Sequence, residues 1–207
     1  MAPLLEIAEY LRQGGWIMGP LVVVSVVMWT LIIDRLRDYR GLTAGDLDGR
    51  AAVAAVAAGD GAALDGRDGL KVRLVREFLA ERTGRAPLDR DILVECALRQ
   101  RRHLDRGLAP ITVLAAVAPL LGLLGTVLGM IETFDVISVF GTGNARALAG
   151  GISVALITTQ TGLLVAIPGL IMANRLARRA DQLRTGLDEA TAAVARHLGR
   201  SGRTVAS

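Results

Sequence analysis

The chain has 207 residues, of which 52% are hydrophobic but only 3% aromatic, and its formal net charge is +4. The apolar residues are mostly Ala, Leu, Val and Ile, which is unusual material for a soluble core. Three long stretches contain no Asp, Glu, Lys, Arg or His, and this pattern excludes a soluble enzyme. The stretches are residues 13–33, 107–131 and 147–174.

Each stretch reaches the roughly 20 residues that a helix needs to cross a bilayer. A β-barrel is excluded because its strands alternate polar and apolar residues, whereas these stretches are apolar on all sides. The sequence therefore predicts an all-α membrane protein in which long cytoplasmic helices extend three transmembrane helices. We expect the spans at residues 16–33, 107–131 and 152–173.

We expect the first stretch to be a membrane anchor and not a cleaved signal peptide. Glu6, Glu9 and Arg12 precede it, Arg35 follows it, and it lacks a small-x-small cleavage site. A signal peptide has the opposite charge arrangement.

Arginine residues near the ends of the spans predict the orientation, because positively charged flanks stay in the cytoplasm. Four arginines precede the second span and four follow the third, whereas only Arg146 lies between them. We expect a periplasmic N-terminus (1–15), a cytoplasmic insertion (34–106), a periplasmic connection (132–151) and a cytoplasmic tail (174–207). The sequence pI of about 10.1 is then a signature of topology, and we expect no nucleic-acid partner.

The cytoplasmic parts look helical. In the insertion, a segment rich in Ala, Gly and Asp precedes helices expected at 70–82 and 88–106, with Asp89 as a cap of the second helix. The tail carries a heptad pattern that fits either packing on the protein's own helices or pairing between subunits, followed by a disordered end at 199–207. The heptad positions are Leu176, Ala180, Leu183, Leu187, Ala190 and Val194.

We expect no metal site and no cofactor. Cys96 is the only cysteine, so it forms no intrachain disulfide, and it reads as a buried and inert thiol. His103 and His197 have no second ligand at a metal-site spacing.

Small residues recur at helical spacing in the second and third spans, and they predict close approach of helix backbones in lipid. These packing residues are Ala118, Gly122, Gly125 and Gly129 in the second span, and Gly162 and Ala166 in the third. We expect the protein to form a homo-oligomer. Packing alone would also suit a structural membrane scaffold.

Polar residues in these spans indicate more than packing. Thr126 lies five positions from the outer end of one span and Thr159 seven positions inside the other, so their depths differ by only ~3 Å. Thr158, Thr159, Gln160 and Thr161 are consecutive, and four polar side chains in succession cannot all face lipid cheaply. None of them can take up and release a proton near neutral pH.

The segments APLLGLLGTVLGMIETF and ALAGGISVALITTQTGLLVAIPGLIMANRLARR resemble the paired signature of the MotA/TolQ/ExbB proton channel family. The three-span layout is most similar to ExbB and TolQ. The resemblance places Thr126 and Thr159 at the two pore threonines, with Thr158 and Gln160 as accessory polar residues. It departs at Val154, where many relatives carry a glutamate.

The resemblance implies a pentamer in the bacterial inner membrane, with protons as the coupling ion. It also implies an ExbD-like or TolR-like single-span partner whose membrane Asp supplies the missing carboxylate, and a TonB-like protein that receives the energy for outer-membrane import. The alternative within the family is a TolQ-like subunit of an envelope-constriction motor.

Overall fold

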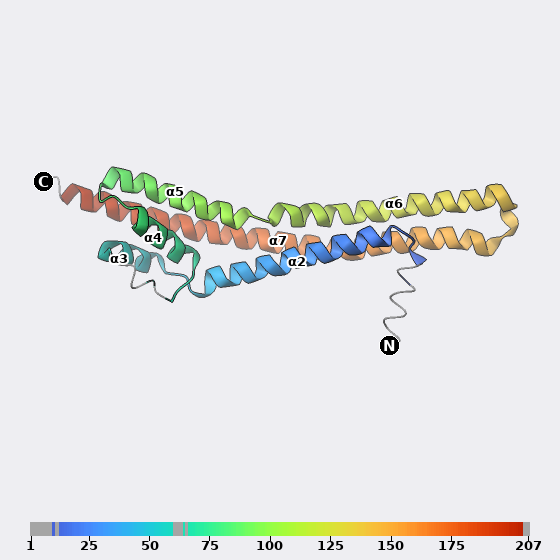
Figure 1. The fold of residues 1–207 in the computed structure, drawn as a ribbon, viewed down its shortest axis with the longest axis horizontal. Helices are drawn as coiled ribbons and strands as arrows, with labels where there is room; N and C mark the ends of the chain where they lie inside the picture. Colours follow the sequence, from blue (N-terminus) through green and yellow to red (C-terminus); the bar gives the residue numbers. More distant parts are fainter. Residues whose placement is uncertain (1–9, 11–12, 60–63, 65, 205–207) are drawn as a thin grey trace. The chain divides into compact units, whose positions relative to one another are not determined.

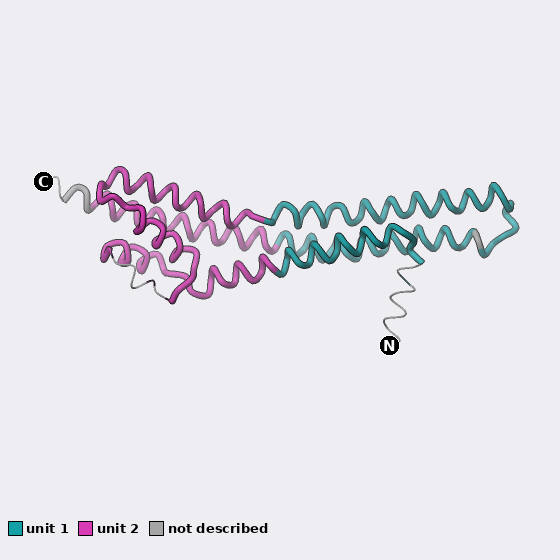
Figure 2. The backbone as a smooth tube through the Cα atoms, in the orientation of Figure 1, with its two compact units in different colours: residues 1–33, 107–174 teal, residues 34–106, 175–207 magenta. Residues whose placement is uncertain are grey.

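The computed structural model describes residue 10 and residues 13–59, 64 and 66–204, and it contains no strand within these ranges. The chain is an all-α membrane protein. Two compact units are distinguished, residues 1–33 with 107–174 and residues 34–106 with 175–207 (Figure 2). The α-helices labelled in Figure 1 are α2 (Met18–Ala44), α3 (Gly49–Ala58), α4 (Leu70–Glu81), α5 (Ala86–Asp105), α6 (Leu108–Phe140) and α7 (Ala145–Thr204). The 3₁₀ turn η2 (Gly141–Gly143) lies between α6 and α7.

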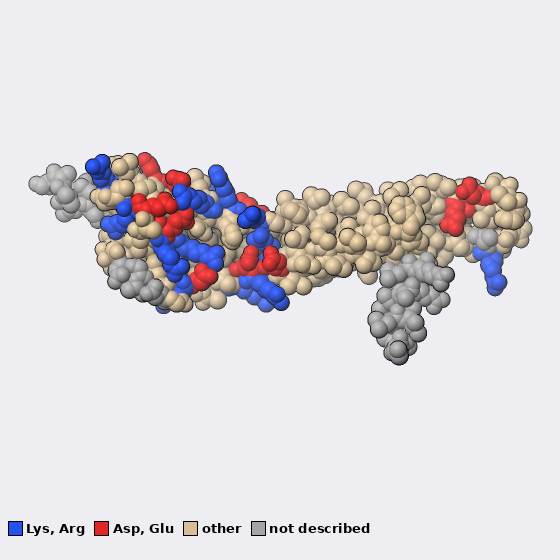
Figure 3. Space-filling model, in the orientation of Figure 1, with Lys and Arg blue, Asp and Glu red and all other residues tan. Residues whose placement is uncertain are grey.

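Three helical segments are long and apolar enough to cross a membrane, and they lie within Met18–Ala44, Ala86–Gly143 and Leu148–Arg200. Large apolar side chains point outward from them: Leu164 is 71% exposed and Leu156 66%. Figure 3 shows few charged residues on the surface of the first unit in this view, whereas Lys, Arg, Asp and Glu crowd the second. These features suit lipid around the first unit and water around the second.

Helices α6 and α7 extend beyond the expected spans. Helix α6 follows Gly107, whose φ of 84° lies in the left-handed region and interrupts the chain after α5. Residues 132–140 and 145–151 are helical, so the non-α-helical connection is confined to residues 141–144. Pro119 and Pro168 lie inside α6 and α7 without ending either helix.

The heptad pattern of the tail packs inside the protein. Leu176, Ala180, Leu187, Ala190 and Val194 are each at most 1% exposed within a single chain. The interpretation as an amphipathic tail on the protein's own helices is therefore confirmed, and this face is not available for pairing between subunits. The same unit also buries Phe78, Leu93 and Leu104 completely.

Two local expectations need correction. Asp89 is not the N-cap of its helix, because α5 begins at Ala86, before it; its buried carboxylate instead accepts hydrogen bonds from the backbone amides of Thr83 (2.6 Å) and Gly84 (3.1 Å) in the preceding loop. The disordered end expected from residue 199 is wrong up to Thr204, since α7 continues to that residue. Residues 205–207, like residues 1–9 and 11–12 with Glu6, Glu9 and Arg12, lie outside the described residues.

Buried and charged contacts hold the second unit together near the end of α5. The Tyr39 hydroxyl donates a hydrogen bond to the carbonyl oxygen of Leu104 at 2.7 Å. Burial raises the pKa of this hydroxyl, so Tyr39 remains a neutral donor. Arg184 of α7 pairs with Asp105 of α5, and Arg101 pairs with Asp188. The last turns of α5 are thereby fixed to α7.

Candidate functional site

The site is built on a seam where the backbones of α6 and α7 touch. An ideal Cβ placed on Gly129 would lie 2.6 Å from the carbonyl oxygen of Gly151, and one placed on Gly162 would lie 2.8 Å from that of Ala118. Only residues without bulky side chains permit this approach. All six predicted packing residues lie in the seam and are buried: Ala118, Gly122, Gly125, Gly129, Gly162 and Ala166.

The seam lies within one chain. The small face of α6 is covered by the small face of α7, so neither is the surface through which copies of the protein would associate. The expectation of a homo-oligomer therefore has to rest on other surfaces and on the family resemblance.

Thr158 is part of the seam. It is fully buried opposite Gly125, where an added Cβ would lie 2.4 Å from the Thr158 Cβ. Its hydroxyl donates to the backbone carbonyls of Val154 (2.9 Å) and Ala155 (3.1 Å), one turn earlier in α7. Such a bond satisfies the hydroxyl within its own helix, so Thr158 acts as a packing residue here.

Thr159 lies beside the seam and bridges the two helices. Its hydroxyl is 3.1 Å from the carbonyl oxygen of Ala155 in α7 and 3.4 Å from that of Gly122 in α6. Thr126 on α6 is likewise half-buried, and its hydroxyl donates to the carbonyl oxygen of Leu123 at 2.6 Å.

Helix α2 covers the opposite edge of the seam. Met18 and Leu21 of α2 form a buried cluster with Ala118 of α6 and Ala166 of α7. Partly buried residues of α6 and α7 pack against this cluster. These residues are Leu121 and Leu128 of α6 and Ile157 and Val165 of α7.

Helical geometry places both threonines away from Leu121 and Ile157, which pack against the α2 cluster. At 100° per residue, Thr126 points about 140° from Leu121, and Thr159 points about 160° from Ile157. Leu123 and Leu163, which lie on the same side as the threonines, are 59% and 47% exposed. The structure therefore brings Thr126 and Thr159 to one edge that no described helix of this chain covers.

The other predicted polar residue does not join them. Gln160 follows Thr159 and points about 100° further around α7, where it is exposed and makes no hydrogen bond to the described residues. The shared edge thus carries two hydroxyls and no titratable group.

Val154 faces a different groove from Thr159, about 140° away around α7. It lines a cavity of about 410 Å³ together with Gly15 and Trp16 near the start of α2, and with Glu132 and Asp135 of α6. These two carboxylates were not among the predicted site residues, because residues 132–151 were expected to form the connection after the second span. The only sequence feature that could have pointed to Glu132 and Asp135 is their position, as the first charged residues after the apolar stretch of 25 residues at 107–131.

One cluster outside the seam has the residue types of a metal site. Oxygen atoms of Glu77 and Glu81 and the Cys96 sulfur lie within 4.8 Å of one another. Arg99 already pairs with both carboxylates, at 2.9 and 2.8 Å. Burial, together with the nearby Glu77 and Glu81, raises the pKa of the Cys96 thiol to about 11 against the opposing effect of Arg99. Arg99 thus joins the two carboxylates in an ion-pair network beside the buried thiol.

Several known proteins are similar in sequence to this chain. The chain is 42% identical over 90 residues to biopolymer transport protein exbB1 of Vibrio cholerae, a match that covers 43% of this chain and 40% of that protein. It is 42% identical to ExbB of Aquifex aeolicus over 78 residues (38% and 53% of the two chains). It is 44% identical to ExbB of Helicobacter pylori over 80 residues (39% and 55%). The matches thus cover at most about half of these relatives.

Residues 68–189, more than half of the chain, match the model of one protein family. The matched range includes the α6–α7 seam, both half-buried threonines, and helices α4 and α5 of the second unit. On this basis, the chain belongs to the MotA/TolQ/ExbB proton channel family.

Proposed function

We propose that the chain is an ExbB-like proton-channel and motor subunit of the bacterial inner membrane, which energises a TonB-like protein for outer-membrane import. The observation that carries this proposal is the edge shared by Thr126 and Thr159, which α2 leaves uncovered. The relatives named above are all called ExbB, which favours an ExbB-like over a TolQ-like role.

A second polypeptide has to supply the proton-carrying group. Residues 107–131 and 152–173 contain no Asp, Glu, His or Lys, and hydroxyl and amide groups do not titrate near neutral pH. An ExbD-like single-span partner with a membrane Asp completes the relay. A charged Asp costs roughly 2.5–3.5 kcal/mol at the centre of a membrane helix, and the hydroxyl-bearing edge offers it polar neighbours.

The assembly places this edge at the centre of a ring. Copies of the chain, five by resemblance to the family, surround the partner helices with Thr126 and Thr159 facing inward. The N-terminus is periplasmic and the C-terminus cytoplasmic. One proton that crosses ~100 mV releases only ~2.3 kcal/mol, so work across the envelope requires several protons.

Thr159→Val tests the proposal because it keeps the shape of the side chain and removes the hydroxyl. Thr161→Val is a matched control: Thr161 lies two positions away in α7, and its hydroxyl also bonds one turn back, to Ile157 at 2.8 Å. It differs in its second contact, which is the Tyr10 hydroxyl at 3.3 Å instead of a carbonyl oxygen of α6. Two positions along a helix, Thr161 also points about 160° away from Thr159. If Thr159 lines the proton path, only Thr159→Val abolishes import that depends on the TonB-like protein.

Assembly is measured in the same cells by co-purification of the ExbD-like partner. The loss of one hydrogen bond in a membrane costs about 0.6 kcal/mol, too little to dismantle an oligomer, so both variants should assemble. Thr126→Val should behave like Thr159→Val. Full import by a normally assembled Thr159→Val complex would remove Thr159 from the mechanism and leave the hydroxyls as packing groups.

A further inference from the structure

The α6–α7 hairpin is longer than the hydrocarbon core of a bilayer is thick. Helix α6 has 33 residues, which span ~50 Å, whereas the core measures ~30 Å. Even tilted by about 40°, the upper end of the range for membrane helices, α6 is ~38 Å tall. Counted from Gly107, Phe134 lies ~40 Å along the helix, between the exposed residues Glu132 and Asp135. This end of the hairpin, which continues past the start of α2 in Figure 1, therefore lies outside the hydrocarbon.

The edge that carries Thr126 continues onto this outer part of α6 as a row of apolar side chains. Met130, Phe134 and Ile137 follow at helical spacing, and each points within about 80° of Thr126. Met130 is 40% exposed and Phe134 is 61% exposed. The row thus leads from the threonine level to a phenylalanine beyond the membrane.

Helix α7 extends the same edge outward. Ile152 and Leu156 point about 20° and 60° from Thr159, and they are 45% and 66% exposed. We call the apolar side chains of the two helices the outer stripe. Its members are Met130, Phe134, Ile137, Ile152 and Leu156.

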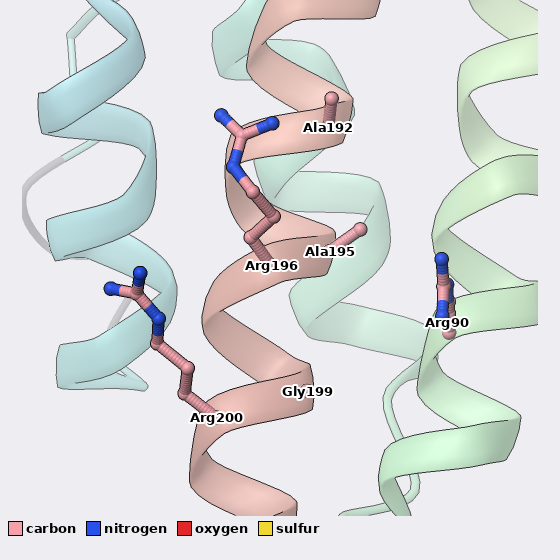
Figure 4. Close-up of a pocket in the computed structure, with 6 residues that line it drawn as sticks. All are labelled: Arg90, Ala192, Ala195, Arg196, Gly199 and Arg200. Carbon is pink, nitrogen blue, oxygen red and sulfur yellow. The ribbon is translucent and has the colours of Figure 1, made fainter.

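The charged side chains of this part of α6 stand away from the outer stripe. Glu132 points about 160° and Asp135 about 140° from Met130. Both line the cavity shared with the start of α2. The stripe thus differs in character from the groove of about 530 Å³ in the second unit, which three arginines help to line (Figure 4). A polypeptide that covers the outer stripe has to be apolar.

The position of the stripe indicates what covers it. Helix α2 is not the cover, because its cluster contacts Leu121, which points about 180° from Met130. The hydrocarbon of the bilayer ends before Phe134, so lipid tails do not cover that residue. The stripe is continuous with the edge of Thr126 and Thr159, and a straight helix that lies along the two threonines also passes over Phe134.

We propose that the outer stripe binds the membrane helix of the single-span partner, and that this helix continues for about two turns beyond the bilayer as an uncharged, apolar helix. Its side chains cover Phe134 and Ile152. The inference rests on the proposed function, which brings the partner's helix to the threonine edge. It adds a second contact surface, outside the membrane, to the one inside.

The test is photo-cross-linking in intact cells that produce the single-span partner with an affinity tag. The photoreactive amino acid p-benzoylphenylalanine replaces Phe134, Val139 or Leu123, one at a time. At Phe134 it should cross-link to the partner. Val139 is the matched control, because it is 71% exposed on the same part of α6 but points about 140° from Phe134. At Val139 the cross-link to the partner should be lost.

Leu123 separates this inference from the proposed function, since it is 59% exposed on the threonine edge within the membrane. Cross-links to the partner from Leu123 but not from Phe134 would overturn the inference alone. Absence of cross-links from both positions would overturn the proposed function as well. Cross-links from Phe134 to a second copy of the chain, or to lipid only, would assign the stripe to another neighbour and also overturn the inference.

Binding of the purified partner in mild detergent gives the magnitude. Phe134→Gln should lower the apparent affinity about five- to thirtyfold, the effect of no longer burying most of one phenylalanine side chain. Val139→Gln should leave the affinity unchanged. Equal affinities of the Phe134→Gln variant and the unmodified protein would contradict the inference.

Discussion

Two adjacent glycines of α7 offer a direct test of the backbone seam. An ideal Cβ on Gly151 would lie 2.6 Å from the carbonyl oxygen of Gly129 and 2.3 Å from the Thr133 hydroxyl oxygen, whereas one on Gly150 would meet nothing within 4 Å. Both glycines are helical. Alanine therefore changes helix propensity equally at the two positions, but it clashes with α6 only at position 151.

The expected difference follows from these distances. Alanine is favoured over glycine inside a helix by ~1 kcal/mol, so Gly150→Ala should be neutral or stabilising. Gly151→Ala must move the two backbones apart by roughly 0.8 Å, the gap between 2.6 Å and an ordinary contact of 3.4 Å. Overpacking of this kind costs ~1–3 kcal/mol. We expect Gly151→Ala to be less stable than Gly150→Ala by about this amount.

Unfolding in mixed micelles of mild detergent and SDS measures the difference, with fluorescence of the two tryptophans, Trp16 and Trp29, as the signal. Addition of Thr133→Ala should not rescue Gly151→Ala, because the collision with the Gly129 backbone remains. Equal stability of the Gly150→Ala and Gly151→Ala variants would refute the reasoning. Full rescue by Thr133→Ala would show that the obstacle is a side chain and not the backbone.

Three further outcomes are expected. In a background with Cys96→Ala, an impermeant maleimide added outside the cell should label Gly143→Cys and not Arg67→Cys; the reverse pattern would overturn the proposed orientation. With its pKa raised to about 11, the Cys96 thiol should resist iodoacetamide at pH 8 in the folded protein. Labelling as fast as in denaturant would contradict this expected resistance. The buried thiol stabilises the folded protein fully below the thiol's unfolded pKa of ~8.5, and this stabilisation should fall as the pH rises from there towards 11. Asp89→Ala leaves loop amides without a buried acceptor and should lower the free energy of unfolding of the second unit by ~1–3 kcal/mol, whereas exposed Asp91→Ala should change little.

Much of the fold follows from one-dimensional patterns. The length of the charge-free stretches predicts three membrane helices, and the heptad spacing of Leu176, Leu187 and Val194 predicts a buried stripe. The spacing could not decide what covers that stripe, because a period of 3.5 is the same for packing within a chain and between chains. The same ambiguity led us to associate the small faces with oligomer formation, whereas α6 and α7 use them on each other.

The candidate site was only partly accessible to sequence reasoning. Equal depth of Thr126 and Thr159 follows from the helical rise, but the choice of edge depends on where α2 packs, and no local pattern encodes this. Consecutive residues such as Thr159 and Gln160 point about 100° apart, so a polar run cannot act as one cluster. The position of Val154 near Glu132 and Asp135 likewise needs the third dimension.

The composition of the seam also affects how ordering entropy is distributed among the three membrane helices. Glycine and alanine have no side-chain rotamers to lose, so α6 and α7 associate at almost no cost in side-chain entropy. Helix α2 instead packs through long side chains such as Met18 and Met28, and an immobilised methionine can cost up to ~2 kcal/mol. This cost grows with temperature. On heating, α2 should therefore loosen while α6 and α7 remain a single rigid pair.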